Sequence, residues 1–470
     1  MLARTLLSIV IVAGTLPFAS LCLAAPVSTA EALVAAVNGG AEGETVEVGP
    51  GTFELSAPLE PKPGMTIQGA GKDKTIITGV ASWKPSTKSL PDPEMKTQGL
   101  DSQAYLVRLP DKAAGITITG MTLRGPHVHG AIYGFGNVDL HLHDLRIADT
   151  LWCGIRTFAM QKAKIHDCEF IDAGGRWKRG GEPGIDGGIT GGAIFAIWMK
   201  ESEIAHNRFT RTQPSKADEF YGIKCRQGKQ SRIHHNTIEV NFSIELPFEN
   251  DEDVEIDHNI CHGTISIPKH AGGPVPESGR TFHIHHNYFR DSYSIEFVRN
   301  GVEIDHNLFD FDLQKDHGNL ISGFGKAPAA GPASFHNNLV SNPGRGVIWI
   351  NEPYSNFAIH NNHIITRTTT TPRRDGLFGF HSECDFETIT IRDNIIECQG
   401  EPRPLLRSKE SYQITLQNNQ LTNVADIDQL DNPQTNDKAG PTQPLKFECG
   451  VHGELTVDQW QTSPTKTARR

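Results

Sequence analysis

The chain repeats one short pattern, in which an apolar residue is followed by two polar residues and an asparagine. Clear copies are Ile233-His-His-Asn236, Ile256-Asp-His-Asn259, Ile284-His-His-Asn287 and Ile304-Asp-His-Asn307. The series begins at Ile204-Ala-His-Asn207 and continues through Phe335-His-Asn-Asn338, Ile359-His-Asn-Asn362, Ile391-Arg-Asp-Asn394 and Leu416-Gln-Asn-Asn419. The nine asparagines recur at intervals of 29, 23, 28, 20, 31, 24, 32 and 25 residues. Self-similarity at this spacing is typical of a stacked solenoid.

The residues around each asparagine indicate what one repeat contains. Apolar and polar residues alternate, as in Val254-Glu-Ile-Asp-His258, and β-branched residues are frequent, which predicts strands and not helices. Each repeat therefore predicts a strand, a tight bend at the asparagine, a second short strand, a loop and a third strand. Coils about 4.8 Å apart would stack the asparagines in one column, where the amides would bond to one another. We expect an all-β protein, a parallel β-helix with an asparagine ladder, whose histidines before the asparagines face solvent or stack.

The two ends of the chain differ from the repeats. Residues 1–24 predict an export signal, with Arg4, an apolar run from Leu6 to Leu16 and small residues near Ala24, so we expect a secreted or periplasmic protein. Ser28-Thr-Ala-Glu31 predicts the start of a short helix over Ala30–Val37 that would cap the first coil. We thus predict a signal peptide at 1–24, a capped β-helix at 25–425 and a tail at 426–470 that wraps the coils or is partly disordered.

Composition excludes several classes of function. The 470 residues include 44 Lys and Arg against 55 Asp and Glu, a net charge of −11, so nucleic acid is not an expected partner. Beyond the signal no long apolar run predicts a transmembrane segment. We also expect the protein to be a monomer. Seven of the eight cysteines follow the signal at irregular spacing, which predicts neither a disulfide scaffold nor a zinc motif. Cys384 and Cys398 form the one pair that we consider for a bridge.

The ladder, three strands per coil and the helical cap together resemble the right-handed parallel β-helix of the pectate lyase-like superfamily. The segment from Glu31 to Gly79, with Gly43-Glu-Thr-Val46, Gly51-Thr-Phe53 and Gly69-Ala-Gly-Lys72, is similar to the start of the alginate lyase and chondroitinase branch. The resemblance covers about residues 26–425. It implies a carbohydrate-active enzyme whose substrate lies along the sheet made by the third strands. It carries no short catalytic signature, so the chemistry has to be argued from the residues of that sheet.

The third strands predict a column of side chains on the outer face of this sheet. If the first and third residues of each strand triplet face the core, the middle residue faces outward. The column then contains Tyr133, Arg156, Phe195, Lys224, Glu245, Ser266, Glu296, Ile321, Trp349, Phe378 and Arg407. Ionisable residues flanked by aromatic ones suit a sugar polymer, because rings stack on sugars and polar groups bind hydroxyls. A solvated, salt-bridged sheet face is the structural alternative.

The first candidate chemistry is β-elimination on a uronate-containing polysaccharide. It needs a base for the proton beside the carboxylate and a partner that neutralises the carboxylate. Lys224 or Lys269 would be the base, and Arg226 or Arg299 would hold the carboxylate. Glu245 and Glu296 are candidate ligands for Ca²⁺. Further candidate substrate-binding residues are Arg156, Arg176, Trp177, Phe195, His270, Trp349 and Phe378.

Two alternatives stay open. Glu245 and Glu296 are expected two rungs apart, about 9.6 Å, near the ~6.5–9.5 Å separation of the carboxyl groups in inverting glycoside hydrolases. Paired glutamates would then act as acid and base. The second alternative is a non-enzymatic surface or binding protein, in which replacing Glu245 would cause no loss of function.

Overall fold

The computed structural model describes most of the predicted repeats. The described residues are 25–83, 104–174, 191–212, 220–240, 242–246, 252–267, 280–290, 295–297, 301–311, 320–323, 333–350, 357–367, 376–380, 389–406, 414–425, 446–448 and 454–456. The predicted signal peptide at 1–24 and most of the tail from 426 lie outside them. None of the described helices has the length and apolar character needed to cross a membrane.

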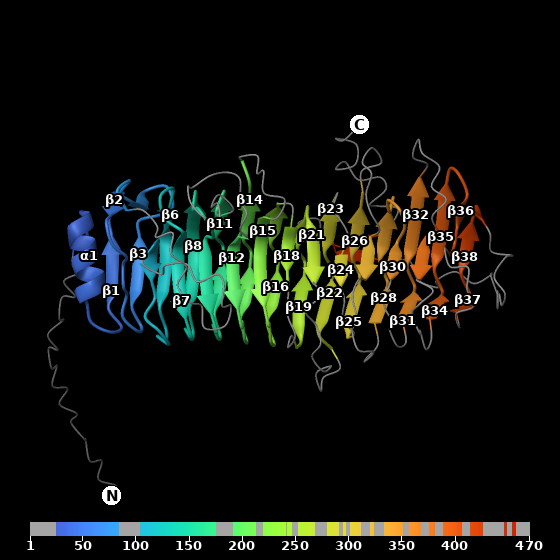
Figure 1. The fold of residues 1–470 in the computed structure, drawn as a ribbon, viewed down its shortest axis with the longest axis horizontal. Helices are drawn as coiled ribbons and strands as arrows, with labels where there is room; N and C mark the ends of the chain where they lie inside the picture. Colours follow the sequence, from blue (N-terminus) through green and yellow to red (C-terminus); the bar gives the residue numbers. More distant parts are fainter. Residues whose placement is uncertain are drawn as a thin grey trace, which may run out of the picture.

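The described chain forms an elongated stack of coils, and each full coil contributes three strands (Figure 1). Two of them, one on each side of the bend, belong to a 26-stranded parallel sheet, here sheet A. The strands before the bend are β10 (Lys164–His166), β13 (Glu203–Ala205), β16 (Arg232–His234), β19 (Val254–Asp257), β22 (Phe282–His285), β25 (Val302–Asp305), β28 (Ala333–His336), β31 (Phe357–His360), β34 (Ile389–Arg392) and β37 (Ile414–Gln417). Those after the bend are β11 (Glu169–Ile171), β14 (Arg208–Thr210), β17 (Thr237–Glu239), β20 (Ile260–Cys261), β23 (Tyr288–Arg290), β26 (Leu308–Asp310), β29 (Leu339–Ser341), β32 (His363–Arg367), β35 (Ile395–Gln399) and β38 (Gln420–Thr422).

The third strands form a separate parallel sheet of eleven strands, sheet B. They are β5 (Tyr105–Arg108), β7 (Gly130–Phe135), β9 (Ile155–Phe158), β12 (Gly191–Ile197), β15 (Phe220–Arg226), β18 (Phe242–Glu245), β21 (Thr264–Ile267), β24 (Ile295–Phe297), β27 (Ile321–Gly323), β30 (Ile348–Ile350) and β33 (Phe378–Phe380). The expected coil of three strands is confirmed.

The remaining elements lie toward the two ends of the chain. At the start, sheet A contains β1 (Thr45–Val48), β2 (Gly51–Leu55), β3 (Thr66–Gly69), β4 (Thr75–Gly79), β6 (Thr117–Arg124) and β8 (His141–Ala148). Toward the C-terminus, β36 (Arg403–Pro404) pairs with β39 (Val424–Ala425) in parallel, and β40 (Lys446–Glu448) pairs with β41 (Glu454–Thr456) in an antiparallel hairpin.

All nine repeat asparagines form one ladder, as predicted. Each side-chain amide nitrogen donates to the Oδ1 atom of the next asparagine at 2.9–3.1 Å, from Asn207 to Asn419. The same Oδ1 atoms accept from the backbone N–H of the preceding asparagine, and all nine residues are at most 2% exposed. The amides therefore satisfy one another inside the stack, where an unpaired polar group would be costly.

The bend differs in one detail from the expectation of a one-residue turn. The left-handed conformation belongs to the residue before each ladder asparagine, such as His206 at φ 56° and Asn361 at φ 54°. The bend thus points one residue outward and turns the next, the asparagine, into the coil. Isoleucines that precede the bend, including Ile233 and Ile256, are fully buried in register and form an apolar column of the core.

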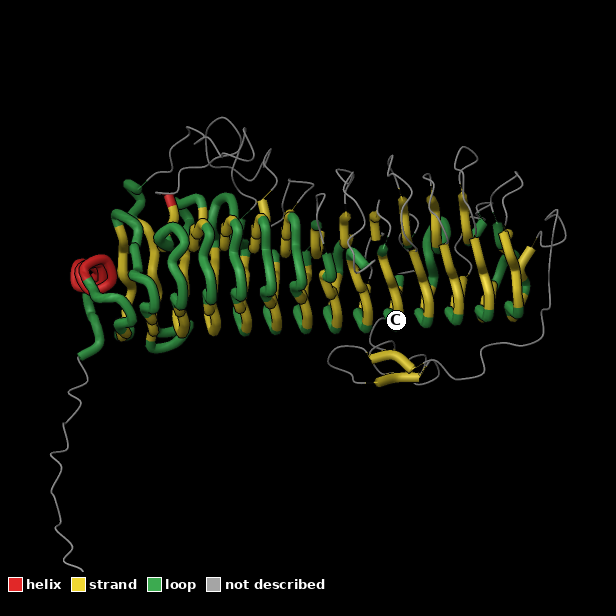
Figure 2. Tube along the Cα trace, turned by 90° about the horizontal axis from the view of Figure 1, so that it is seen from below, coloured by secondary structure: helices red, strands yellow, loops and turns green. Residues whose placement is uncertain are grey.

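A helix covers the first coil at one end of the stack (Figure 2). Helix α1 (Ala30–Gly39) begins after Thr29, whose Oγ1 accepts from the Ala32 N–H at 3.2 Å, and it buries Leu33 and Val37. The predicted cap is confirmed, although the helix runs two residues past Val37. Cys398 is buried, and Cys384 lies outside the described residues, so the candidate bridge between them stays a prediction.

Candidate functional site

The strand register of sheet B places most of the predicted outer column as expected. Residues in this column pair in turn from Tyr133 through Arg156, Phe195, Lys224, Glu245 and Ser266 to Glu296. The column continues through Ser322 and Trp349 to Gly379. Parallel in-register pairing stacks these residues in one column although Tyr133 and Gly379 are 246 positions apart in the chain.

Two members of the predicted column face the core instead. Ile321 pairs with Ile295 and Ile348, and Phe378 pairs with Ile348, all of them core residues. The predicted substrate contact of Phe378 is therefore wrong, since its side chain is fully buried inside the coil. The reason is local: Leu320 and Leu377 precede these residues, and two adjacent apolar residues leave the alternation without a unique register.

The N-terminal half of the outer column lies under a second hydrophobic cluster. This outer aromatic cluster consists of Tyr105, Leu151, Trp152, Cys153, Phe158, Phe195 and Ile197, with Tyr133, Phe135 and Trp198 packed against it. Arg156 is 2% exposed, and its guanidinium carbon lies 4.2 Å from the Trp152 ring centre and 5.0 Å from that of Phe195. We expected the outer column to be exposed to solvent, but Arg156 and Phe195 are buried under the outer aromatic cluster. Their role in substrate binding stays a prediction, and it requires side chains of this cluster to move aside.

At the edge of this cluster Lys224 and Glu245 form a buried ion pair. Neighbouring strands β15 and β18 place them on adjacent rungs, and they are 2% and 7% exposed. The Lys224 ammonium also lies 4.6 Å from the Tyr221 ring centre and 5.6 Å from that of Phe195. Removing two charges from water is expensive, and their attraction offsets that cost only while both partners remain.

The other predicted site residues divide into three groups. Glu296 lies two rungs from Glu245, and Arg226 lies two residues after Lys224 on β15, so their backbones are placed although their side chains are not described. Trp349 is half-buried, and a Cβ atom at Gly379 would lie 2.2 Å from its ring, so the glycine leaves the space that the indole occupies. Outside the described residues lie Arg176, Trp177, Lys269, His270 and Arg299.

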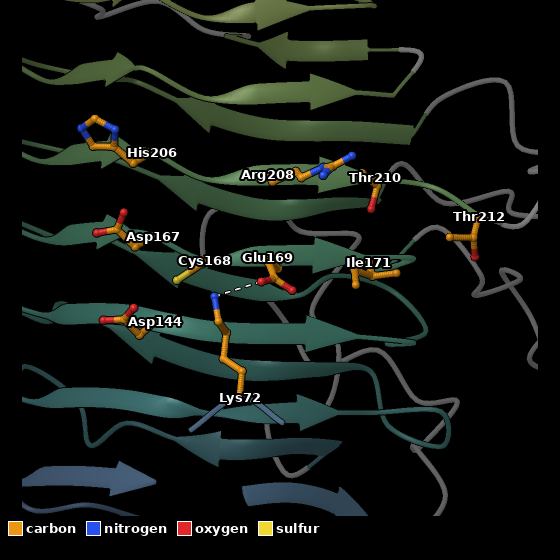
Figure 3. A pocket seen from close by; sticks show the side chains of 10 residues that line it. All are labelled: Lys72, Asp144, Asp167, Cys168, Glu169, Ile171, His206, Arg208, Thr210 and Thr212. Carbon is orange, nitrogen blue, oxygen red and sulfur yellow. Dashed lines mark ion pairs between the residues drawn. The ribbon is translucent and has the colours of Figure 1, made fainter. Parts of the chain in front are cut away.

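An open groove that the sequence did not predict crosses the second strands of sheet A. It has a volume of about 740 Å³, and its charged residues form ion pairs such as Lys72–Glu169 at 3.0 Å (Figure 3). The lining residues are Lys72, Asp144, Asp167, Cys168, Glu169, Ile171, His206, Arg208, Thr210 and Thr212. They come from separate coils and from the turn before β4, so no local motif marks the groove.

Two columns of ionisable residues run along the outer side of sheet A at the bend. The bend column contains the left-handed residues His206, His235, His258, His286 and His306, whose successive rings stack at 4.7–5.1 Å, as expected, and it continues with Asn337 and Asn361. The strand-end column contains His234, Asp257, His285, Asp305, His336 and His360. Histidine and aspartate alternate over its first five rungs, which avoids stacking like charges one rung apart.

Protonation of His360 is expected to destabilise the fold. Burial, followed by repulsion from His336 and Arg392, lowers the pKa of His360 to about 4, against about 6.5 in an unfolded chain. The unfolded chain therefore binds the proton more tightly, and the stabilising contribution is complete above about pH 6.5 and is lost as the pH falls toward 4. We expect the urea midpoint to fall over this window, and His360→Thr to remove part of the fall. An unchanged pH slope in the variant would contradict this assignment.

Comparisons with known proteins agree with this architecture. A family model described as a right-handed beta helix region matches residues 131–310, and no curated protein matches the sequence. The alginate lyase AlyF-OU02 in complex with G6 is 13% identical, with 89% of this chain and 95% of that chain covered and a TM-score of 0.53. A tailspike protein mutant of E. coli bacteriophage HK620, in complex with a hexasaccharide, is 11% identical, with 83% and 72% covered and a TM-score of 0.51.

A third similar structure is an A-module of an Azotobacter vinelandii mannuronan C-5 epimerase. It is 12% identical, with 84% of this chain and 89% of that chain covered and a TM-score of 0.41. At 11–13% identity, the two structures with TM-scores over 0.5 show a shared fold alone. The parallel coils, the ladder and the family match over residues 131–310 agree, and the described chain folds as a right-handed parallel β-helix.

Proposed function

We propose that the protein is a carbohydrate-active enzyme that cleaves a uronate-containing polysaccharide by β-elimination, with its site on the outer face of sheet B. The observation that carries this proposal is the Lys224–Glu245 pair, which is buried beside Tyr221 and Phe195. Apolar side chains at these positions would satisfy the fold at lower desolvation cost, so a buried charge pair on the face of a sheet points to a chemical role.

The fold supports a saccharide as the substrate class. The two structures reported above with TM-scores over 0.5 are an alginate lyase in complex with G6 and a tailspike protein in complex with a hexasaccharide. Farther along the outer column, Trp349 offers a half-buried ring, and flat rings of this kind stack on sugars. The predicted secretion and monomeric state fit an enzyme that acts on an extracellular polymer.

β-Elimination at a uronate requires a base to take the proton beside the carboxylate while the glycosidic oxygen leaves from the neighbouring carbon. Lys224 has to lose its ammonium proton before it can act as this base, and the Glu245 carboxylate is its buried partner. The amine then takes the substrate proton, the C–H electrons form the double bond, and the glycosidic bond breaks. We propose that Arg226, two residues after Lys224 on the same strand, holds the substrate carboxylate.

Of the two candidate calcium ligands, the structure describes the side chain of Glu245 only. Glu245 already accepts the Lys224 ammonium, and the Glu296 side chain is outside the description. A Ca²⁺ ion held by Glu245 and Glu296 therefore stays a prediction, and no step above depends on it.

A panel of anionic and neutral glycans tests the proposed activity. We expect a product with the ultraviolet absorbance of an unsaturated uronate from at least one uronate polymer, and none from neutral glycans. The matched control is the Lys224→Arg variant, which keeps the positive charge opposite Glu245 and should form the absorbing product far more slowly. No absorbing product from any uronate polymer would overturn the lyase assignment.

An inverting glycoside hydrolase is the second candidate. Glu245 and Glu296 lie two rungs apart, which supports this candidate because inverting enzymes hold their carboxyl groups roughly 6.5–9.5 Å apart. New reducing ends without ultraviolet absorbance would favour it. No product from any glycan would favour a binding or structural protein.

A further inference from the structure

Three imidazoles from two neighbouring coils meet at the bend of sheet A. His206 belongs to one coil, and His234 and His235 to the next, and one ring nitrogen from each lies within 4.8 Å of the others. The Nδ1 atoms of His234 and His235 are 2.8 Å apart, and the His206 ring stacks on that of His235 at 4.9 Å. His234 is buried, whereas His206 and His235 are exposed, so the cluster opens to solvent on one side.

A carboxylate fixes the tautomer of the central ring. The His234 Nε2 atom lies 2.6 Å from Oε1 of Glu203, which accepts a hydrogen bond and has none to give when ionised. His234 therefore carries its proton on Nε2, and its Nδ1 atom presents a lone pair to the cluster. Metal-binding histidines in proteins usually donate their second ring N–H to a carboxylate in this way.

We propose that His206, His234 and His235 bind one divalent transition-metal ion of the Zn²⁺ class, which bridges two coils of the β-helix. Imidazole nitrogen is a preferred ligand of such ions, and three histidines leave a fourth tetrahedral position for water. Zinc–nitrogen bonds of about 2.0–2.1 Å in a tetrahedron put the ligand nitrogens about 3.4 Å apart, which lies between the 2.8 Å of the His234–His235 pair and the 4.8 Å limit of the group. The proposal does not depend on the activity proposed for sheet B, because the two sites lie on different sheets.

The first group differs from the neighbouring groups in its charged contacts. The described residues contain three further groups of histidine and carboxylate side chains at similar spacing. In one of them Asp257 is bound by Arg232 through two hydrogen bonds of 2.6 and 2.7 Å. The other two share His283, whose Nδ1 atom lies 3.2 Å from the Arg280 guanidinium. In those groups an arginine is bonded to one of the ligand atoms and repels a cation. Arg232 also acts on His234 of the first group, but its hydrogen bonds go to Asp257, and the charged group in contact with His234 is the Glu203 carboxylate.

Titration of the full-length protein with Zn²⁺ alone, followed by calorimetry and by thermal melting, tests the site. His206→Asn and His235→Asn remove one ligand each and preserve the left-handed backbone, because Asn337 and Asn361 adopt it in the same column. We expect each to weaken the tightest Zn²⁺ binding about 100-fold or more and to abolish the rise in melting temperature. Glu203→Gln, which leaves all three imidazoles, should weaken binding about 10–100-fold.

His286→Asn is the matched control. His286 has the same conformation, and its Nδ1 atom lies 2.8 Å from that of His285, but it belongs to none of the four groups. Its removal should leave the tightest site unchanged. The proposal is overturned if the unaltered protein binds no Zn²⁺, if the His206 and His235 variants bind it as tightly as the unaltered protein, or if His286→Asn weakens binding as much as they do.

Discussion

Replacing Asn287 by leucine is expected to destabilise the β-helix by about 3–5 kcal/mol, because several buried polar groups lose their partners together. The Asn287 amide donates to Asn307 Oδ1 and to the carbonyl oxygens of Ile256 and His285. Its Oδ1 atom accepts from the backbone and the side chain of Asn259. Leucine is similar in size but makes none of these hydrogen bonds. The polar groups in the adjacent coils are then left buried without partners.

Denaturation in urea, with the fall in unfolding free energy as the readout, measures this effect. Asn337→His is the matched control, since Asn337 has the left-handed conformation of the bend column and His306 holds that conformation one coil earlier. We expect the control to change stability by less than about 0.5 kcal/mol, as for an ordinary surface substitution. An Asn287→Leu variant as stable as this control would show that the ladder contributes little.

The repeat made the ladder predictable, because one asparagine in each coil marks the same structural position. The outer column was predictable for the same reason wherever a single apolar residue flanks each outward residue, as Ile223 and Ile244 flank Lys224 and Glu245. Prediction failed at Ile321 and Phe378, where paired apolar residues permit two registers. Which of the two apolar residues faces the core is then decided by packing against the strands of the adjacent coils. The sequence of a single strand does not contain this information.

The burial of the outer face could not be predicted from alternation. Period two separates the two faces of a strand but does not say whether the second face is covered. Here Trp152 and Leu151, which precede β9 in a turn, pack with Phe158 and Phe195 on that face. The metal-site candidate was also missed, because His206 and His235 are 29 residues apart and meet only through the coil spacing.

Lys224→Arg is the substitution expected to affect activity most without unfolding the chain. Arginine keeps a positive charge opposite Glu245, but its pKa above 12 prevents it from acting as a base. If Lys224 takes the substrate proton, we expect the turnover rate to fall about 10²–10⁴-fold, the usual contribution of general-base catalysis, with little change in melting temperature. If Glu245 and Glu296 instead act as a hydrolase pair, Glu245→Gln should abolish turnover while Lys224→Arg keeps most of it.

Removal of one charge alone does not separate these roles, because it also damages the fold. Lys224→Ala leaves Glu245 buried without its partner, which costs about 3–5 kcal/mol in comparable pairs. The double variant Lys224→Met with Glu245→Leu removes both charges and retains apolar volume, so it is expected to be about as stable as the unaltered protein. An inactive but stable double variant would assign the pair to catalysis. A double variant that stays active would show that the pair is structural, and the catalytic groups would then have to be sought farther along the column, near Glu296 and Trp349.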